Sequence, residues 1–190
     1  MFVKVLVPYI SCLLVLDSDG ERIIAKYYNG KAKTEQTKFE AMLQKKTKFL
    51  NFRSDAEVIL LDQEIVVVKG STDCKLIICG SVDENELILV SVLDAVFDTI
   101  LTLLRGQFDK RVMLDNLELI LLTIDEVLDH GQIMELEATS VASRVLMKGS
   151  ADVGGAMNNQ ATAAAVGDMT ISQALGLARN QFIKSLTSGN

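Results

Sequence analysis

The chain has 190 residues, of which 49% are hydrophobic and only 5% aromatic, so we expect one domain of ordinary size with an aliphatic core and residues left over for a tail. The formal net charge of −6 argues against nucleic acid as the main partner, because phosphate binding requires clustered positive charge. The single histidine makes serine-histidine-aspartate, cysteine-histidine and multi-histidine zinc sites difficult to build, which excludes much of enzyme chemistry.

The N-terminal stretch over residues 1–16 is apolar, but we do not expect it to be a targeting segment. Pro8 and Tyr9 interrupt it, and it lacks the small-residue cleavage site of a secretory signal. It is also shorter than the roughly 20 residues needed to span a bilayer. The cysteines are few and odd in number, which favours reduced thiols and a cytoplasmic protein.

The first half of the chain is predicted to form strands around one helix. Five short aliphatic runs bounded by turn residues are predicted strands: residues 13–16, 23–28, 58–61, 65–69 and 76–79. The turn sequence Asp17-Ser18-Asp19-Gly20 predicts a hairpin between the first two. Residues 34–50 place apolar side chains on one face of an amphipathic helix. The predicted order of elements is therefore β-β-α-β-β-β.

The second half is predicted to be helical. Asp83 and Glu86 have the spacing of a capping box, and the helix that they open is predicted to run to about Arg105, where Gly106 is a natural stop. A second long helix is predicted from Asp109 to Asp129. A short helix is then predicted over residues 139–147.

The composition after this point predicts a separate tail. Residues 149–169 contain Gly, Ala, Asn and Ser without hydrophobic periodicity, which is typical of a flexible linker. Apolar residues at steps of three and four then predict an amphipathic C-terminal helix over residues 170–187. The folded domain in this prediction spans residues 1–148.

The two long helices carry broader apolar faces than one side of a small sheet requires. Tight packing within the chain and a surface left for a partner explain this pattern equally well. If a partner binds there, the predicted interface residues are Leu89, Leu93 and Phe97 of the first helix with Leu117 and Leu121 of the second.

Charge is unevenly distributed along the chain. Residues 26–53 contain eight basic and two acidic side chains, a net of +6, whereas residues 83–137 contain thirteen acidic and three basic ones, a net of −10. Solvated helix faces are the simplest interpretation. The alternative is docking, with the basic segment directed toward anionic lipid or an acidic partner.

No motif in the sequence predicts catalysis, a cofactor or a metal site. Dinucleotide-binding, Walker A and nucleophile-elbow patterns are absent. Cys74 and Cys79 are predicted to point to opposite faces of a strand and therefore do not converge on a metal. His130 is predicted to follow a helix end, where its positive form favours the negative terminus. Asp125 and Glu126 point about 100° apart on a helix and do not converge on a substrate.

Four segments together resemble the coatomer zeta subunits. They are residues 14–28, Ser54–Val58, Glu84–Leu87 and Leu122–Glu135, of which the last is the longest match. The similarity covers about residues 10–147, in order and with fitting spacing. It implies an α+β, longin-like and sigma-adaptin-like fold, with a five-stranded antiparallel sheet in the order β-β-α-β-β-β-α-α and helices on both faces. The strand over Cys74–Cys79 departs from the group, which usually has an aromatic-rich strand there.

The resemblance implies a small structural subunit of the COPI vesicle coat without catalytic residues, cofactor or metal. It implies pairing with the trunk of the large gamma chain, within a subcomplex that includes beta and delta. It also implies peripheral association with Golgi membranes and COPI vesicles through the coat, recruitment by an ADP-ribosylation-factor GTPase, and Golgi-to-ER and intra-Golgi transport. A clathrin-adaptor sigma chain, a longin domain of a tethering or GTPase-regulatory complex, and an enzyme with an unrecognised site stay open as alternatives.

Overall fold

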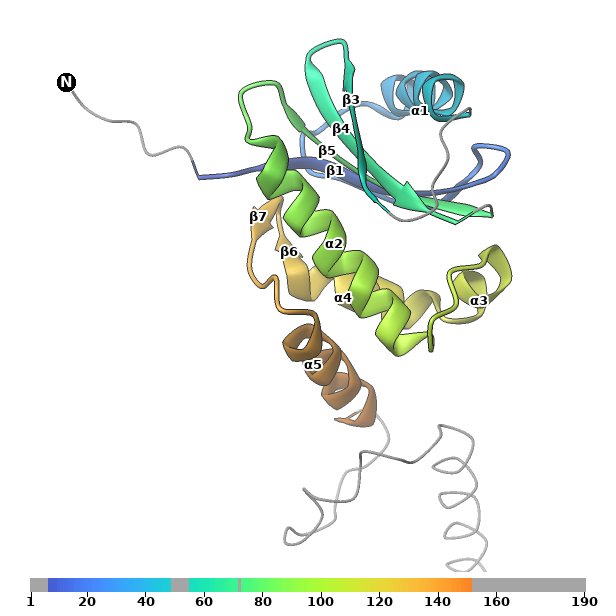
Figure 1. Ribbon diagram of the computed structural model, residues 1–190, viewed down its shortest axis with the longest axis vertical. Helices are drawn as coiled ribbons and strands as arrows, with labels where there is room; N and C mark the ends of the chain where they lie inside the picture. Colours follow the sequence, from blue (N-terminus) through green and yellow to red (C-terminus); the bar gives the residue numbers. More distant parts are fainter. Residues whose placement is uncertain (1–6, 49–54, 72, 152–190) are drawn as a thin grey trace, which may run out of the picture. The chain divides into compact units, whose positions relative to one another are not determined.

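A five-stranded antiparallel sheet with helices on both faces forms the described part of the chain (Figure 1). The structure is a computed structural model and describes residues 7–48, 55–71 and 73–151. These residues belong to the first of two compact units, which ends at Val153. The predicted helix over 170–187, and the predicted linker after residue 151, lie outside the described residues.

The order of elements confirms the α+β prediction and the strand pattern of the first half. The elements are β1 (Ile10–Asp17), β2 (Arg22–Tyr27), α1 (Lys33–Thr47), β3 (Glu57–Leu61), β4 (Glu64–Gly70), β5 (Cys74–Ser81), α2 (Glu86–Leu103), α3 (Lys110–Asp115), α4 (Leu117–Val127), β6 (Leu128–Asp129), β7 (Gln132–Ile133) and α5 (Ala138–Ala151). The last helix continues four residues beyond its expected end at Met147.

The sheet has the strand order β2-β1-β5-β4-β3, and every neighbouring pair is antiparallel. All eight residues of β1, which lies between β2 and β5, are buried, since helices cover both of its faces. A strand buried on both faces is typically a continuous apolar run rather than an alternating one, as the sequence of β1 shows. Cys74 and Cys79 of β5 lie in the core on opposite faces of the sheet, as predicted.

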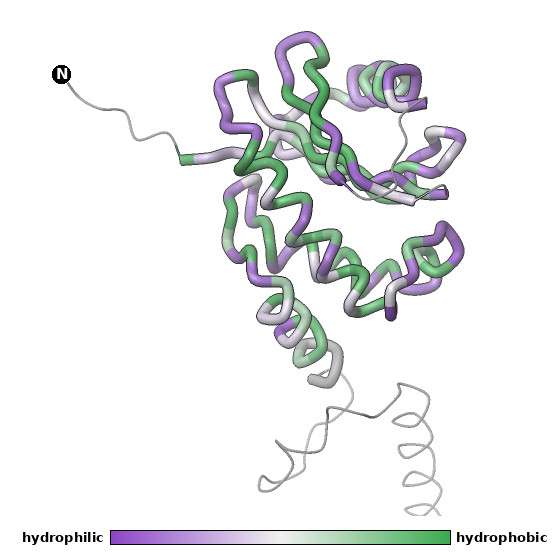
Figure 2. The backbone as a smooth tube through the Cα atoms, in the orientation of Figure 1, coloured by the Kyte–Doolittle hydropathy of each residue, from purple (hydrophilic) through white to green (hydrophobic). Residues whose placement is uncertain are grey.

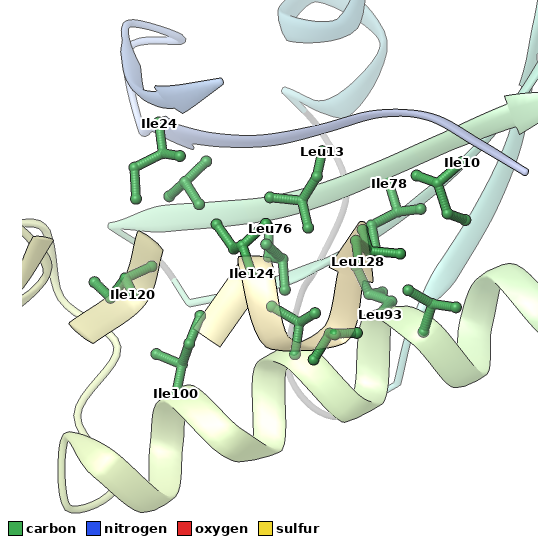
Figure 3. Close-up of a cluster of buried hydrophobic side chains, with 14 of the residues drawn as sticks. Ile10, Leu13, Ile24, Leu76, Ile78, Leu93, Ile100, Ile120, Ile124 and Leu128 are labelled. Atoms are coloured by element: carbon green, nitrogen blue, oxygen red, sulfur yellow. The ribbon is translucent and has the colours of Figure 1, made fainter. Parts of the chain in front are cut away.

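Two apolar layers stabilise the sheet, one on each face. On one face α1 packs through Phe39 and Leu43. On the other, α2 to α5 bury a larger cluster, in which residues such as Leu93 of α2 and Ile124 of α4 meet side chains of the sheet (Figure 3). In Figure 2 hydrophilic residues dominate α1, whereas hydrophobic residues occupy the centre of the sheet.

The first long helix differs from its prediction at its start. Asn85 is the N-cap, because its side-chain Oδ1 accepts a hydrogen bond from the backbone N–H of Leu87 at 2.9 Å. The predicted capping residue Asp83 precedes this cap and was wrong. The predicted stop is confirmed: Gly106 has φ of +80° and donates its N–H to the carbonyl of Leu101 at 2.7 Å.

The second long helix is interrupted, contrary to prediction. Asn116 separates α3 from α4 with φ −126° and ψ 28°, and its side-chain Nδ2 donates to the carbonyl of Val112 at 2.8 Å. After Val127 the chain forms the small hairpin β6–β7, in which His130 and Gly131 both have positive φ, of 48° and 83°. Two positive φ values define a type I′ hairpin turn. His130 therefore lies in a hairpin turn, and the prediction that it compensates a helix terminus was wrong.

Candidate partner interface

The described residues do not assemble a recognisable catalytic or metal site. Within residues 7–48, 55–71 and 73–151, no group of three or more His, Cys, Asp or Glu side chains could hold a metal ion. No helix of the described chain is long and apolar enough to cross a membrane.

A pocket of about 240 Å³ lies between β2 and the β6–β7 hairpin. It is lined by Tyr28, Asp125, Leu128, Asp129 and His130. Burial, together with the nearby carboxylates of Asp125 and Asp129, raises the pKa of the Tyr28 phenol. The phenol is therefore protonated at neutral pH and is not activated as a base, and we assign no reaction to this pocket.

Two of the five predicted interface residues lie in the core of this chain. Leu89 is 1% exposed and Leu93 is fully buried, and both side chains pack against the sheet. The prediction of these two as partner-facing residues was wrong. The physical reason is that α2 packs against the sheet on one side and against α4 and α5 on another. Ala95 and Thr99 of α2 are buried as well. The sheet and the helices α4 and α5 together cover much of the broad apolar face of α2.

The other three predicted residues lie nearer the surface but are not brought together. Phe97 is half-buried against Phe108, with ring centroids 4.7 Å apart, and the Lys69 Nζ lies 4.9 Å from its ring centroid. Leu117 is half-buried at the start of α4. Leu121 is 38% exposed on the outer side of the same helix.

Four exposed apolar side chains lie at the β3 edge of the sheet, in the loop before α2 and at the start of α2. Val58 and Leu60 of β3 are 49% and 65% exposed, and Val82 and Leu87 are 42% and 73% exposed. We call these four residues the β3–α2 surface. This surface was not predicted from the sequence, because β3 is an unbroken apolar run and the sequence does not show which of its side chains face the core. One signal was present in the sequence. The strand is apolar at every position after Glu57, and an edge strand that is apolar on both faces has more apolar surface than one core layer can cover.

The sheet register explains how these four residues come together. Ile59 and Leu61 face the α1 side, so Val58 and Leu60 project on the α2 side. Leu60 pairs with Ile65, Ile65 pairs with Gly80, and a Cβ built on Gly80 would lie 3.0 Å from Leu89 of α2. The start of α2 therefore lies over the row of paired residues that runs across the sheet from Gly80 through Ile65 to Leu60. A backbone hydrogen bond of 3.2 Å from Val82 to Gln63 joins the loop before α2 to the β3–β4 turn.

The β3–α2 surface has an acidic rim. Helix α2 carries Glu86, Asp94 and Asp98 and no basic residue. Asp62 in the β3–β4 turn is exposed. Lys69 forms an ion pair with Asp94 at 2.5 Å, which leaves the carboxylates of Glu86 and Asp98 at the surface. An apolar centre with a charged rim is the usual anatomy of a protein interface, and this rim favours a partner with basic side chains.

Comparison with known proteins places the chain in a family. The model of the clathrin adaptor complex small chain matches residues 9–152. Coatomer subunit zeta-3 of Arabidopsis thaliana is 38% identical over 181 residues, which cover 94% of each chain. Coatomer subunit zeta-1 of Homo sapiens is 36% identical over 179 residues, which cover 93% of this chain and 92% of that protein.

A homology model of the full-length AP-3 complex contains a chain of similar fold, with a TM-score of 0.58 over 75% of this chain and 94% of that one, at 12% identity. The chain belongs to the clathrin adaptor complex small chain family. Coatomer zeta subunits are its homologues, as the sequence resemblance predicted. The family and these homologues are structural subunits rather than enzymes, and they support a small subunit of a coat complex.

Proposed function

We propose that this protein is the small subunit of a COPI-type vesicle coat and pairs with the trunk of the large gamma chain. The single observation that carries the proposal is the β3–α2 surface, which exposes four large apolar side chains on a member of an adaptor small-chain family. An isolated domain gains nothing from an exposed Leu60 and Leu87, whereas a permanent interface resembles a domain core cut in two.

In this proposal the large chain covers the β3–α2 surface, and Phe97, Leu117 and Leu121 are separate candidate contacts outside it. The pair would act within a subcomplex that includes beta and delta. Its place would be the cytosolic face of Golgi membranes and COPI vesicles, with recruitment by an ADP-ribosylation-factor GTPase acting on the whole coat. Retrieval of cargo from the Golgi to the ER, and transport within the Golgi, would follow from membership of that coat.

The relatives favour a coatomer subunit over a clathrin-adaptor sigma chain. The coatomer zeta subunits align with 36–39% identity over almost the whole chain, whereas the AP-3 likeness has 12% identity and supports the fold alone. A longin domain of a tethering complex would be expected to bind a small GTPase directly, and a pull-down with GTPases separates that alternative from this proposal.

Co-expression with the gamma trunk of the same organism, followed by size-exclusion chromatography, tests the proposal. We expect a stable one-to-one complex, and self-association or aggregation of the chain when it is expressed alone. The double variant Leu60→Asp with Leu87→Asp should abolish the complex, because two charges would enter an apolar interface. Leu114→Asp is the control, since Leu114 is 45% exposed on α3, which follows the C-terminal end of α2, whereas Leu87 lies at the N-terminal end of that helix (Figure 1). A wild-type chain that remains monomeric in the presence of gamma contradicts the proposal.

A further inference from the structure

Most basic residues of the segment 26–53 are lysines that lie exposed on α1 and its C-cap. Lys26 and Lys31 are already paired, with Asp125 and Glu64, and Arg53 lies outside the described residues. The other five basic residues of the segment are exposed along α1 and its C-cap: Lys33, Lys38, Lys45, Lys46 and Lys48. We call these five the α1 lysine face. Over the ranges that the structure describes, no salt bridge joins any of them to an acidic side chain.

The helix directs these lysines away from the sheet. Phe39 and Leu43, four residues apart, are buried against the sheet, whereas Lys38, Lys45 and Lys48 recur at steps of seven and three and are exposed. The two acidic residues of α1 neutralise them only in part. Glu35 is exposed and accepts the backbone N–H of Ala32 at 3.3 Å, so five exposed lysines and one exposed glutamate leave a net charge of +4. Glu40 is 8% exposed and is bound by Arg22 at 2.6 Å.

The acidic part of the chain lies on the opposite face of the sheet. Helix α1 packs on one face, and α2 to α5 pack on the other (Figure 1). The net negative charge of residues 83–137 is carried by α2, α3, α4, the β6–β7 hairpin and the loops that join them, all of which precede α5. The fold thus converts a charge difference along the sequence into a charge difference across the sheet. An anionic surface would therefore attract the α1 side and repel the other side.

Helix stability does not account for the α1 lysine face. Lys45 and Lys46 lie in the last turn, where a positive charge is favourable to the helix dipole. Lys33 lies at the first helical position, where a positive charge is unfavourable. Lys38 lies in the middle and has neither effect. No salt bridge within the described residues compensates the charge of this face, and a negative partner outside the chain would do so.

We propose that the α1 lysine face binds an anionic lipid surface. Protein interfaces are depleted of lysine and enriched in aromatic residues, methionine and arginine. The exposed side of α1 has no arginine and no aromatic residue, and its only apolar residues are Ala41 and Met42, of which Met42 is 37% exposed. Lysine is a compact, strongly hydrated charge, suited to attraction at a headgroup layer without burial. Because the apolar side of α1 already packs on the sheet, the contact is peripheral and electrostatic rather than inserted.

This inference goes beyond pairing with a large chain. The β3–α2 surface and the α1 lysine face lie on opposite sides of the sheet, so one does not obstruct the other. The lipid contact is a property of this chain and is tested without the large chain.

Flotation of the full chain with lipid vesicles tests the proposal. We expect the chain to float with phosphatidylserine-containing vesicles at low salt, to remain in solution with vesicles of phosphatidylcholine alone, and to dissociate as salt shortens the Debye length below about 10 Å. The double variant Lys38→Gln with Lys45→Gln should lower the partition at least tenfold, since each lysine near an anionic surface contributes about fivefold. Arg105→Gln with Arg111→Gln removes the same charge from exposed positions on the α2–α3 side and should change the partition by less than about twofold.

Three results would overturn the proposal. The first is no flotation of the wild-type chain with phosphatidylserine vesicles at low salt. The second is an equal loss in both double variants, which would make net charge rather than the α1 lysine face responsible. The third is release of the bound chain by a soluble acidic peptide at equal charge concentration, which would identify an acidic protein as the partner. Thermal unfolding of each variant, compared with that of the wild-type chain, confirms that the fold is retained.

Discussion

The carboxylate of Asp17 accepts a hydrogen bond from the Nζ of Lys110 at 2.7 Å, although the two residues are 93 positions apart. Asp17 ends β1 and its side chain is 2% exposed. The same carboxylate also accepts the backbone N–H groups of Asp19 and Glu21, at 3.0 and 2.7 Å, and so fixes the first hairpin turn. One buried side chain therefore joins the β1–β2 hairpin to the start of α3.

This arrangement predicts a stability that depends on pH. Burial alone would raise the pKa of the Asp17 carboxyl, but the hydrogen bonds from Lys110, Glu21 and Asp19 outweigh it and lower the pKa below its ordinary value of 3.8. The ionised form therefore stabilises the fold above this value, and the contribution is lost as the pH falls through the lowered pKa. Asp17→Asn should lower the free energy of unfolding by about 3 kcal/mol at neutral pH, measured by chemical denaturation. A difference from wild type that stays constant from neutral pH into the acid range would contradict this prediction.

A second prediction concerns the corrected interface residues. Leu93→Asp should reduce the free energy of unfolding by about 4 kcal/mol or more, because it places an unpaired charge in the core below α2. Leu121→Asp, on the exposed side of α4, should change it by less than about 1 kcal/mol. Urea denaturation of both variants compares the two positions. Equal losses at Leu93 and Leu121 would show that α2 does not pack as described.

A third prediction concerns the thiols, all three of which are free and buried. Burial raises the pKa of Cys74 to about 12 and raises the pKa of Cys79 well above its ordinary value. Both thiols are therefore protonated at pH values where alkylating reagents act, and the reactive thiolate is scarce. Native chain should be labelled by iodoacetamide at least a hundredfold more slowly than unfolded chain, measured by mass spectrometry. Rapid labelling of Cys74 in the folded chain would be inconsistent with its burial.

A fourth prediction concerns the hairpin turn after α4. Gly131 has φ of +83°, and an added Cβ would lie 2.6 Å from the backbone oxygen of Ile10. That oxygen belongs to β1, and the Ile10 N–H donates to the carbonyl of Gly131 at 2.8 Å, so neither segment moves freely. Gly131→Ala should therefore lower the free energy of unfolding by about 1 to 3 kcal/mol. Gly30→Ala, with similar φ but no atom within 4 Å, is the control and should cost less.

The elements that the sequence predicted are those whose signals are local. The turn at Asp17-Ser18-Asp19-Gly20 and the stop at Gly106 are short patterns, and the structure has both. The start of α3, by contrast, is fixed by residues that are distant in the sequence. The first N–H of α3, on Lys110, is donated to the side chain of Asp73 at 2.7 Å, and the Lys110 side chain binds Asp17. Partners this distant along the chain are invisible to periodicity.

The residues of the candidate interface were also difficult to predict, because their exposure depends on contacts between distant parts of the chain. The width of an apolar helix face can be predicted from the sequence, but the elements that cover the face cannot. Leu89 and Leu93 are covered by the sheet of the same chain. Val58 and Leu60 were missed because every residue of β3 after Glu57 is apolar, so the sequence does not mark which side chains the sheet leaves exposed. The basic segment, by contrast, was visible as charge, and the structure separated its paired residues from its exposed ones.

The burial of β1 on both faces has a consequence for synthesis on the ribosome. Its neighbour β2 follows at once, but its other neighbour, β5, pairs Cys79 with Cys12 and is translated much later. At about 5 to 20 residues per second, the nascent first hairpin waits for seconds with one strand edge open and apolar side chains without their covering helices. Long-range pairing of this kind folds slowly and exposes the chain to aggregation. We expect the nascent chain to depend on chaperones most strongly between the emergence of β1 and that of β5.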